Sequence, residues 1–312
     1  MNYGKLEISV VIPVYGSSNY LKNLYQRTTN ILFGMGANYE IIFVEDSGPD
    51  DAWEIIKEIS LSDLRVKGYK LSKNFGQHNA LLCGIRNSEG KLIITMDDDL
   101  QHPPEEIPNL INEINNGYDV VYGKPYKDKK NIPRKIFTKL TKSFLSLAIG
   151  NFRAKKMSSF RVFRGSLKGS FENFNSEIIN IDILLTYAAK NFSEINVKNN
   201  FRRSGKSGYN FLKLSKHTIN ILTGFSTAPL HFASIIGITL SIFGLVIFSY
   251  VCIMWFLYKN VLPGFTFLAS IISIFSGAQL LSVGILGEYI ARIHKKLLNK
   301  PSYVVSEKIN TN

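Results

Sequence analysis

The stretch KLIITMDDDLQHPPE, residues 91–105, decides the fold. Its apolar run LIIT (92–95) is followed after one methionine by three consecutive aspartates, Asp97, Asp98 and Asp99. A strand that is apolar on both faces is typical of a parallel sheet covered by helices on both sides. In such sheets ligands bind beyond the carboxyl ends of the strands, so the aspartates lie where a binding site is expected.

The same pattern recurs through the first 125 residues. Short, β-branched-rich strands are predicted at Glu7–Tyr15, Tyr39–Asp46, Val66–Ser72, Lys91–Asp98 and Tyr118–Gly123. Helices are predicted between them, near 18–33, 51–61, 77–88 and 104–116. Polar clusters follow the strand ends, as the fold rule requires: Pro13-Val14-Tyr15, Glu45-Asp46-Ser47-Gly48, Lys73-Asn74-Phe75-Gly76 and the aspartates. The sequence therefore predicts an α/β domain with a mostly parallel sheet.

The acidic triplet indicates a cation site. Three adjacent carboxylates repel one another unless a cation compensates. Hard oxygen ligands suit Mg²⁺ or Mn²⁺, and these ions also bind substrate phosphates. On an extended segment, alternate residues point the same way, so we expect Asp97 and Asp99 to face one ion together. An acidic triplet in a loop is more often a solvated turn, but the preceding core strand and the following LQHPPE favour a site.

Two long stretches carry no Lys, Arg, Asp or Glu: His217 to Tyr258 and Asn260 to Gly287. A helix needs about 20 apolar residues to cross the hydrocarbon core of a bilayer. We therefore predict two transmembrane helices, roughly Pro229–Leu257 and Phe265–Gly287, joined by a tight turn. The alternative is a buried hairpin in a large soluble core.

The charge distribution predicts the orientation of these spans and bears on whether the protein binds nucleic acid. Lys and Arg number 37 against 24 Asp and Glu, a formal net charge of +13. Such an excess first suggests nucleic acid, but much of it flanks the spans, so no nucleic-acid partner is expected. Lys213 and Lys216 precede the first span, Arg292, Lys295, Lys296 and Lys300 follow the second, and only Lys259 separates them. The positive-inside rule puts both termini in the cytoplasm.

The expected organisation has four parts. Residues 1–210 form the α/β domain, without a signal peptide, 211–228 a juxtamembrane amphipathic segment, 229–291 the hairpin and 292–312 a cytoplasmic tail. Within the domain, 133–149 reads as a basic amphipathic helix. It lies in the headgroup layer or, alternatively, docks on the sheet as an ordinary surface helix. Cys83 and Cys252 are far apart, which excludes a disulfide scaffold or a cysteine zinc site.

Several motifs in the same order carry a resemblance to a known family. MDDDLQHPPE (96–105) resembles the DxDLQxPPE signature of family 2 glycosyltransferases that act on polyprenyl phosphates. The likeness extends to SVVIPVY (9–15), VEDSGPD (44–50), LSKNFGQHNALLCG (71–84), SSFRVFR (158–164), the R-x-x-G-x-S-x-Y pattern at 202–209 and GILGEYIARIHKKLLNKPSYVV (284–305). These enzymes are similar to dolichol-phosphate mannose synthase and include bacterial enzymes that load one sugar onto undecaprenyl phosphate. The resemblance implies a GT-A fold, Rossmann-like, followed by two transmembrane helices.

Carried over position by position, the resemblance implies roles for individual residues. The nucleotide-sugar pocket takes Pro13, Tyr15, Asp46, Asp97, Asp98, Arg202 and Ser207, with Asp46 against the base and Arg202 and Ser207 on a closing segment. Asp97 and Asp99 hold Mg²⁺ or Mn²⁺, and the catalytic set is Asp97, Asp99, Gln101 and Arg161. Gln101 approaches the sugar or helps to fix the acidic loop. Arg161, Arg164 and Arg134 face the acceptor phosphate.

Two positions depart from the family pattern. The family often has an aspartate, proposed as a general base, where this chain has Ser159, and two aspartates where it has Glu45-Asp46. A phosphate monoester has a second pKa near 6, so the acceptor is already largely deprotonated at neutral pH. The departure at Ser159 therefore leaves the reaction class unchanged but leaves the catalytic base unassigned.

The resemblance implies inverting transfer of a single sugar from a nucleotide sugar to undecaprenyl phosphate at the cytoplasmic membrane face of a bacterium. UDP-glucose or a UDP-N-acetylhexosamine is the favoured donor, and the product is a polyprenyl-monophosphate sugar for cell-envelope glycan modification. The family also implies a homo-oligomer, a tetramer. Alternatives are another membrane GT-A enzyme, a glycolipid synthase or a GDP-mannose-dependent transferase, and a catalytically impaired membrane scaffold.

Overall fold

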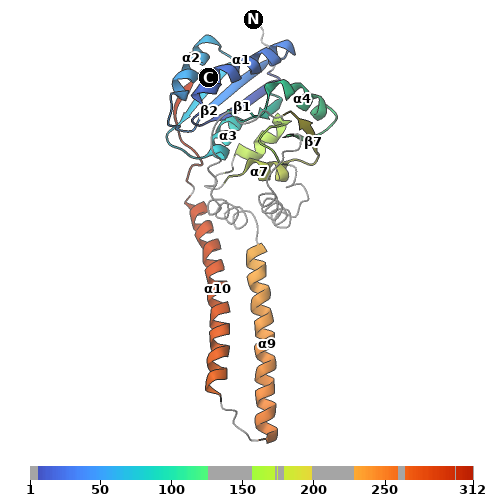
Figure 1. Cartoon of the computed structure of the whole chain (residues 1–312), viewed down its shortest axis with the longest axis vertical. Helices are drawn as coiled ribbons and strands as arrows, with labels where there is room; N and C mark the ends of the chain where they lie inside the picture. The colour runs from blue at the N-terminus through green and yellow to red at the C-terminus, as the bar shows by residue number, and fades with distance from the viewer. Residues whose placement is uncertain are drawn as a thin grey trace. The chain divides into compact units, whose positions relative to one another are not determined.

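The computed structural model describes residues 6–125, 157–172, 174, 179–198, 228–258, 264–298 and 300–311. These residues divide into two compact units (Figure 1). The first unit contains the described residues up to 198 together with 300–311, and the second contains 228–298. The predicted helix at 133–149 and residues 211–227 of the juxtamembrane segment lie outside the described residues.

The first unit is built on one eight-stranded sheet in the order β7-β5-β6-β4-β1-β2-β3-β8. Its strands are β1 (Ile8–Val14), β2 (Tyr39–Glu45), β3 (Val66–Leu71), β4 (Leu92–Thr95), β5 (Val120–Pro125), β6 (Arg161–Arg164), β7 (Phe192–Val197) and β8 (Val305–Ile309). The neighbours β4-β1-β2-β3 are parallel, as the sequence predicts. The strand β6 runs antiparallel to both β4 and β5, and β8 runs antiparallel to β3.

Helices cover both faces of this sheet (Figure 1). One face packs against α1 (Ser18–Gly34), α2 (Ala52–Ser62) and α4 (Ile107–Asn115), which follows the short 3₁₀ helix η1 (Pro104–Glu106). The other packs against α3 (Gln77–Arg86), α6 (Gly169–Glu172) and α7 (Ile181–Ala188); η3 (Gly165–Lys168) precedes α6. Because both faces are covered, every residue of β1 and β2 is buried, which explains the apolar runs VVIPV (10–14) and IIFV (41–44) within them.

One close approach positions α3, the helix that starts beside the acidic loop. A Cβ built on Gly84 of α3 would lie 2.3 Å from Cγ1 of Val11 in β1. Any side chain at position 84 would therefore push α3 away from the sheet. The glycine therefore allows α3 to pack closely against β1 and β2.

The strand β8 differs from the prediction for this part of the chain. We expected a cytoplasmic tail at 292–312, but Val305–Ile309 forms the edge strand beside β3, with Glu307 opposite Lys70. The backbone N–H of Ser72 also donates to the carbonyl of Val304 (2.9 Å). Five residues with two charges give no strong strand signal, and only the partner β3 makes this segment a strand.

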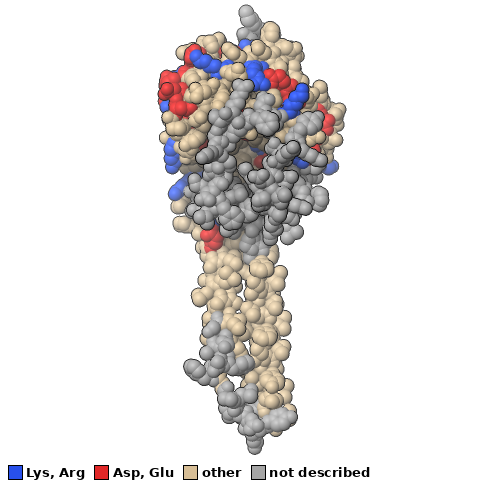
Figure 2. Space-filling model, viewed as in Figure 1, with Lys and Arg blue, Asp and Glu red and all other residues tan. Residues whose placement is uncertain are grey.

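The second unit consists of two long helices, α9 (Ala228–Tyr258) and α10 (Phe265–Leu297). Each contains a stretch long and apolar enough to cross a membrane: Leu230–Val251, with mean hydropathy 2.3, and Ile274–His294, with mean hydropathy 1.4. Only 6% and 0% of these stretches are buried, so neither is the core helix of a soluble protein. On the face in view in Figure 2, the helices carry almost no charged side chains.

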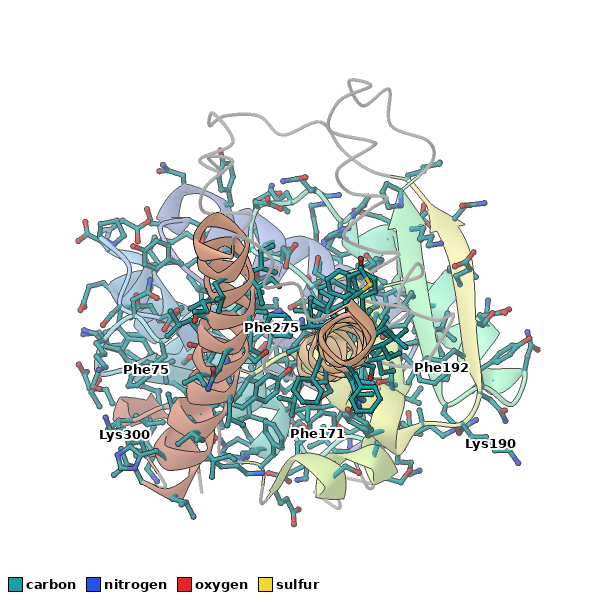
Figure 3. The ribbon with its side chains drawn as sticks, turned by 90° about the horizontal axis from the view of Figure 1, so that it is seen from below. Phe75, Phe171, Lys190, Phe192, Phe275 and Lys300 are labelled. Atoms are coloured by element: carbon teal, nitrogen blue, oxygen red, sulfur yellow. The ribbon has the colours of Figure 1, made fainter. Side chains whose placement is uncertain are left out.

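The helices α9 and α10 pack against each other at a small residue. A Cβ on Gly244 of α9 would lie 2.9 Å from the ring of Phe275 of α10 (Phe275 is labelled in Figure 3). A glycine at such a contact lets two apolar helices approach closely. The predicted transmembrane hairpin therefore matches two packed helices in the structure.

Candidate functional site

The three aspartates form a turn beyond the carboxyl end of β4. The strand ends at Thr95, Asp98 and Asp99 lie in the turn, and Leu100 has a φ of +58°. The acidic run is therefore not extended, and the expected alternation of side chains does not apply. Each carboxylate instead has its own set of partners, and these partners fix its position.

Asp97 is held by two elements that lie far apart in the sequence. Nε2 of Gln77, the first residue of α3, donates to Oδ1 (2.7 Å), and Oγ of Ser159, just before β6, donates to Oδ2 (2.6 Å). Nδ1 of His102 lies 3.8 Å from Oδ2. The His102 ring stacks on Phe160 (5.3 Å between centroids), and burial lowers the pKa of the imidazole. Asp97 thus faces neutral hydrogen-bond donors.

Sequence reasoning gave neither Gln77 nor Ser159 a part in the site. Gln77 lies within the segment LSKNFGQHNALLCG that carries the resemblance, and Ser159 is a departure from the family pattern. The signal that would have found both is positional. Gln77 begins a helix directly after a strand-end loop, and Ser159 lies two residues before Arg161, whose strand pairs with β4.

Asp98 ties the acidic turn to the loop after β1. Its Oδ2 accepts hydrogen bonds from the backbone N–H of Tyr15 (3.0 Å) and the hydroxyl of Ser17 (2.5 Å). Burial, with added repulsion from Asp97 and Asp99, raises the pKa of Asp98 to about 6. Because Oδ2 already has two donors, Asp98 serves to order the two loops.

Asp99 and Gln101 pair with each other. The backbone N–H of Gln101 donates to Oδ1 of Asp99 (3.1 Å), and the side-chain amide of Gln101 donates to Oδ2. Of the two roles expected for Gln101, this geometry corresponds to fixing the acidic loop.

Asp46 orders a third loop at the same edge of the sheet. Its two carboxylate oxygens accept the backbone N–H groups of Phe75 (2.7 Å) and Gly76 (2.8 Å). Gly76 has a φ of +91°, a conformation that glycine adopts without strain. Burial raises the pKa of Asp46, and the two N–H groups oppose that rise. The residue expected to read the nucleotide base therefore has both oxygens engaged by the backbone of residues 75–76.

Pro13 and Tyr15 have different surroundings. Pro13 is buried within β1 and pairs with Val44 of β2. The side chain of Tyr15, just beyond the strand, is 54% exposed. The side chain of Tyr15 is thus accessible to a ligand, whereas Pro13 is part of the buried strand that precedes it.

Arg161 lies at the same sheet edge as the aspartates, but inside the protein. It is 1% exposed, its Nε donates to Oγ1 of Thr95 (2.9 Å), and its Nη1 pairs with the carboxylate of Asp182 in α7. The Thr95 hydroxyl in turn donates to the carbonyl of Ser159 (2.8 Å). Arg161 therefore supports the segment that carries Ser159.

Arg164 lies away from the aspartates, and its expected role at the acceptor phosphate stays a prediction. In the antiparallel register, Arg161 lies opposite Thr95, the last residue of β4, and Arg164 opposite Leu92, the first. The guanidinium of Arg164 donates to the carbonyls of Tyr118 (3.0 Å) and Ile114 (3.2 Å). It therefore lies at the amino end of β4, whereas the aspartates follow its carboxyl end.

Three further residues of the expected site, Arg134, Arg202 and Ser207, lie outside the described residues.

The acidic turn fits a hard divalent cation by the chemistry of its donors. Asp97 and Asp99 offer carboxylate oxygens, which Mg²⁺ and Mn²⁺ prefer. Within the described ranges, no group of three or more His, Cys, Asp and Glu side chains is arranged to hold an ion. Two carboxylates suit a cation that takes its remaining ligands from a diphosphate and water.

The comparisons with known proteins agree with this geometry. Residues 9–174 match the family described as glycosyl transferase family 2. The chain is 33% identical, over 96% of its length, to 92% of the undecaprenyl-phosphate 4-deoxy-4-formamido-L-arabinose transferase of Shewanella sediminis. It is also 33% identical, over 98% of its length, to 95% of the protein of the same name from Edwardsiella ictaluri.

Solved structures show the same fold at low identity. Glucosyl-3-phosphoglycerate synthase from Mycobacterium tuberculosis, in complex with phosphoglyceric acid, has a TM-score of 0.52 and 16% identity, covering 72% of this chain and 80% of that one. Its complex with Mn²⁺, UDP and glucosyl-3-phosphoglycerate has a TM-score of 0.50 and 15% identity, covering 70% and 78%. The predicted GT-A fold is confirmed by this similarity and by the sheet order.

Proposed function

The chain belongs to glycosyl transferase family 2 and is a glycosyltransferase, and from that premise we propose that it transfers one sugar from a nucleotide sugar to undecaprenyl phosphate. The acidic turn carries the proposal, because Asp97 is fixed there by Gln77 and Ser159 at the sheet edge where ligands bind. Relatives that are 31–33% identical over at least 92% of their length are named for this acceptor.

The donor sugar is proposed from the same relatives. Our expectation of UDP-glucose or a UDP-N-acetylhexosamine finds no support in them, since all five are named for 4-deoxy-4-formamido-L-arabinose. We therefore propose a nucleotide-linked formamido-pentose as the donor. UDP is the proposed nucleotide, in keeping with a solved structure of the same fold that holds UDP and Mn²⁺.

In the proposed mechanism, the residues of this chain position the substrates and help to neutralise the charge of the leaving diphosphate. Asp97 and Asp99 hold Mg²⁺ or Mn²⁺, which supplies positive charge for the leaving diphosphate. Asp98 and Asp46 order the loops after β1 and β3, against which the nucleotide lies. Ser159 is too weak an acid and base to activate a nucleophile. The acceptor phosphate needs no such help, because it is largely dianionic at neutral pH.

The acceptor oxygen attacks the anomeric carbon from one face, and the nucleotide diphosphate leaves from the other with the electron pair of the broken bond. One displacement inverts the anomeric configuration. With the nucleophile already deprotonated, most of the acceleration comes from orientation and charge stabilisation. Arg202 of the expected closing segment remains part of this proposal as a source of positive charge.

A membrane location follows from the acceptor and the hairpin. Removing each CH₂ of a lipid from the bilayer costs about 0.8 kcal/mol, so the active site must work at the membrane surface. We propose the bacterial cytoplasmic membrane, with the first unit and both termini in the cytoplasm. The pairing of β8 with β3 supports this topology, because it joins residues that precede the hairpin to residues that follow it. The homo-oligomer implied by the family stays part of the proposal.

The test uses the purified full-length chain, undecaprenyl phosphate, Mn²⁺ and a panel of labelled UDP-sugars: glucose, N-acetylglucosamine and 4-deoxy-4-formamido-L-arabinose. We expect label in a chloroform-soluble product from the formamido-pentose alone. Transfer from another UDP-sugar would contradict the proposed donor but support the proposed transfer to undecaprenyl phosphate. No transfer from any donor, in folded protein, would favour the impaired scaffold.

A further inference from the structure

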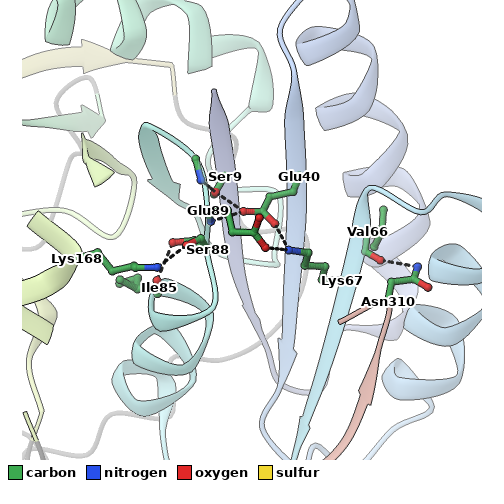
Figure 4. Close-up of polar contacts among 10 residues, drawn as sticks. Ser9, Glu40, Val66, Lys67, Ile85, Ser88, Glu89, Lys168 and Asn310 are labelled. Carbon is green, nitrogen blue, oxygen red and sulfur yellow. Dashed lines mark hydrogen bonds and ion pairs between the residues drawn. The ribbon is translucent and has the colours of Figure 1, made fainter. Parts of the chain in front are cut away.

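The segment that follows the membrane hairpin is part of the sheet that carries the site. Ser302 is buried, and Val305–Ile309 pairs antiparallel with β3 as strand β8. At the end of β8, Nδ2 of Asn310 donates to the carbonyls of Ser60 (2.6 Å) and Val66 (2.9 Å). Figure 4 shows the second of these bonds. The segment 302–310 is therefore fixed along its length.

A cluster of side chains holds β8 on one face of the sheet. Nε1 of Trp53 in α2 donates to Oε2 of Glu307 (3.0 Å), and Nζ of Lys70 in β3 lies 3.5 Å from Oε1 of the same carboxylate. The Lys70 ammonium also lies 5.9 Å from the centre of the Trp53 ring. Glu307 thus joins the C-terminal segment to β3 and to α2.

A second contact holds the segment on the other face. The ring of Tyr303 lies 5.7 Å from the guanidinium carbon of Arg86 in α3, and Tyr303 packs against the core cluster that contains Cys83 of the same helix. Arg86 itself donates to the carbonyls of Phe171 and Phe174 (both 2.9 Å), so it is fixed independently. Tyr303 therefore packs against a residue of α3 whose position is already fixed by other hydrogen bonds.

The loop 72–76 connects the two elements that the C-terminal segment contacts. It begins where β3 ends, and Val304 accepts the N–H of its first residue, Ser72. It closes at Gly76, whose N–H Asp46 accepts, and Gln77 follows as the first residue of α3 and the donor to Asp97. The C-terminal segment is thus hydrogen-bonded to the start of this loop, and through Tyr303 it packs against the last turn of α3, the helix that Gln77 begins.

We propose that Tyr303 and Glu307 are positioning residues for the nucleotide: they hold β3 and α3 so that the loop 72–76 has its binding conformation before the donor arrives. A loop ordered in advance binds more tightly, because less conformational entropy is lost on binding. The inference rests on the proposed function, in that the loop borders the nucleotide site. It adds that the segment next to the membrane hairpin sets donor affinity.

The test measures binding of UDP with Mn²⁺ to the full-length chain by calorimetry, together with thermal unfolding and the KM for undecaprenyl phosphate. In the double variant Tyr303→Ala/Glu307→Ala we expect the Kd for UDP to rise about tenfold, the effect of misplacing about one hydrogen-bonded contact. The acceptor KM should stay unchanged. The conservative double variant Tyr303→Phe/Glu307→Gln should bind UDP within about twofold of the unchanged chain.

Lys308→Ala is the matched control, since Lys308 is exposed on the same strand and should change neither quantity. If the double variant does not fold, Glu307→Ala alone replaces it; this side chain is 52% exposed, and we expect a rise of about threefold in Kd. A lower unfolding temperature with an unchanged Kd would overturn the inference by showing a merely structural role. If the unchanged chain does not bind UDP, the proposed function fails as well.

Discussion

The hydroxyl of Ser159 donates a 2.6 Å hydrogen bond to Oδ2 of Asp97, joining the start of β6 to the acidic turn. An aspartate at position 159 would place a second carboxylate against Asp97, and the two would repel each other. Serine instead leaves Asp97 with its charge and a second fixed partner besides Gln77. In this chain, position 159 therefore aligns Asp97, the cation ligand of our proposal.

Ser159→Ala tests that role. Loss of one hydrogen bond to a charged group costs about 1.5–3 kcal/mol at most, and removal of a general base costs about 10²–10⁴-fold in rate. We expect kcat to fall about tenfold and the Mn²⁺ concentration for half-maximal rate to rise. Steady-state transfer assays measure both. Ser158→Ala, one residue away, is the control. A fall beyond a hundredfold without a change in Mn²⁺ dependence would assign Ser159 to the proton transfer instead.

The sequence predicted the centre of the fold well and its edges poorly. The strands β1, β2 and β4 contain apolar runs, and all four parallel strands end at polar clusters; this pattern is local in the sequence. β6 and β8 have four and five residues with charges among them, so only their neighbours β4 and β3 make them strands. The strand β8 lies more than 230 residues after its partner β3 in the sequence.

The site residues divide in the same way. The acidic turn was located from residues 91–105 alone, because position after a core strand is a local signal. The partners of Asp97 were not found, because Gln77 and Ser159 come from other parts of the chain and meet it only in the folded sheet. Arg161 and Arg164 were assigned together because the motif SSFRVFR does not reveal that its two arginines lie at opposite ends of a strand.

Asp98 makes the fold pH-dependent. Its pKa is raised above the unfolded value by burial, so the folded state prefers the protonated form. Stability is then lost as pH rises from about 4 to about 6 and stays lower above that range. In metal-free protein, Asp98→Asn should raise the unfolding free energy at pH 8 by about 1–3 kcal/mol, with the gain vanishing near pH 4. Thermal unfolding at both pH values measures this.

Asp98→Ala is the counterpart, because it leaves the Tyr15 N–H and the Ser17 hydroxyl without their acceptor. It should destabilise the chain at both pH values. Equal stability of Asp98→Asn and the unchanged chain at pH 8 would show that the carboxylate carries no burial penalty.

A buried ion pair near the amino ends of β2 and β3, away from the acidic turn, stabilises the first unit (Figure 4). Lys67 pairs with Glu40 (2.8 Å), whose side chain is 2% exposed, and with Glu89 (2.6 Å). Lys67→Met leaves Glu40 charged and buried, so we expect the unfolding free energy to fall by about 3–5 kcal/mol. Denaturant unfolding of the full-length chain measures it.

Lys22→Met is the matched comparison, since Lys22 pairs with Glu58 at the same 2.8 Å but both side chains are more than half exposed. It should cost less than about 1 kcal/mol. Adding Glu40→Gln to Lys67→Met should restore part of the lost stability. Equal effects of the two lysine changes would refute a special role for the buried pair.

The proposed topology predicts where reporters are active. A fluorescent protein that matures only in the cytoplasm, fused after residue 312, should fluoresce in whole cells. A periplasmic phosphatase inserted between residues 259 and 263 should be active, because the proposed topology places the segment between the two spans on the far side of the membrane. The opposite pair of signals would reverse the hairpin and separate the site from cytoplasmic nucleotide sugars.

We propose that this glycosyltransferase attaches one sugar to the phosphate of undecaprenyl phosphate with help from the acidic turn. Mass spectrometry of the lipid product, from purified protein with Mn²⁺ and the accepted UDP-sugar, identifies the linkage and the number of sugars. We expect one sugar on a single phosphate, and a yield at least about a hundredfold lower for Asp99→Asn. A diphosphate-linked sugar, a lipid with several sugars, or full activity in Asp99→Asn would contradict it.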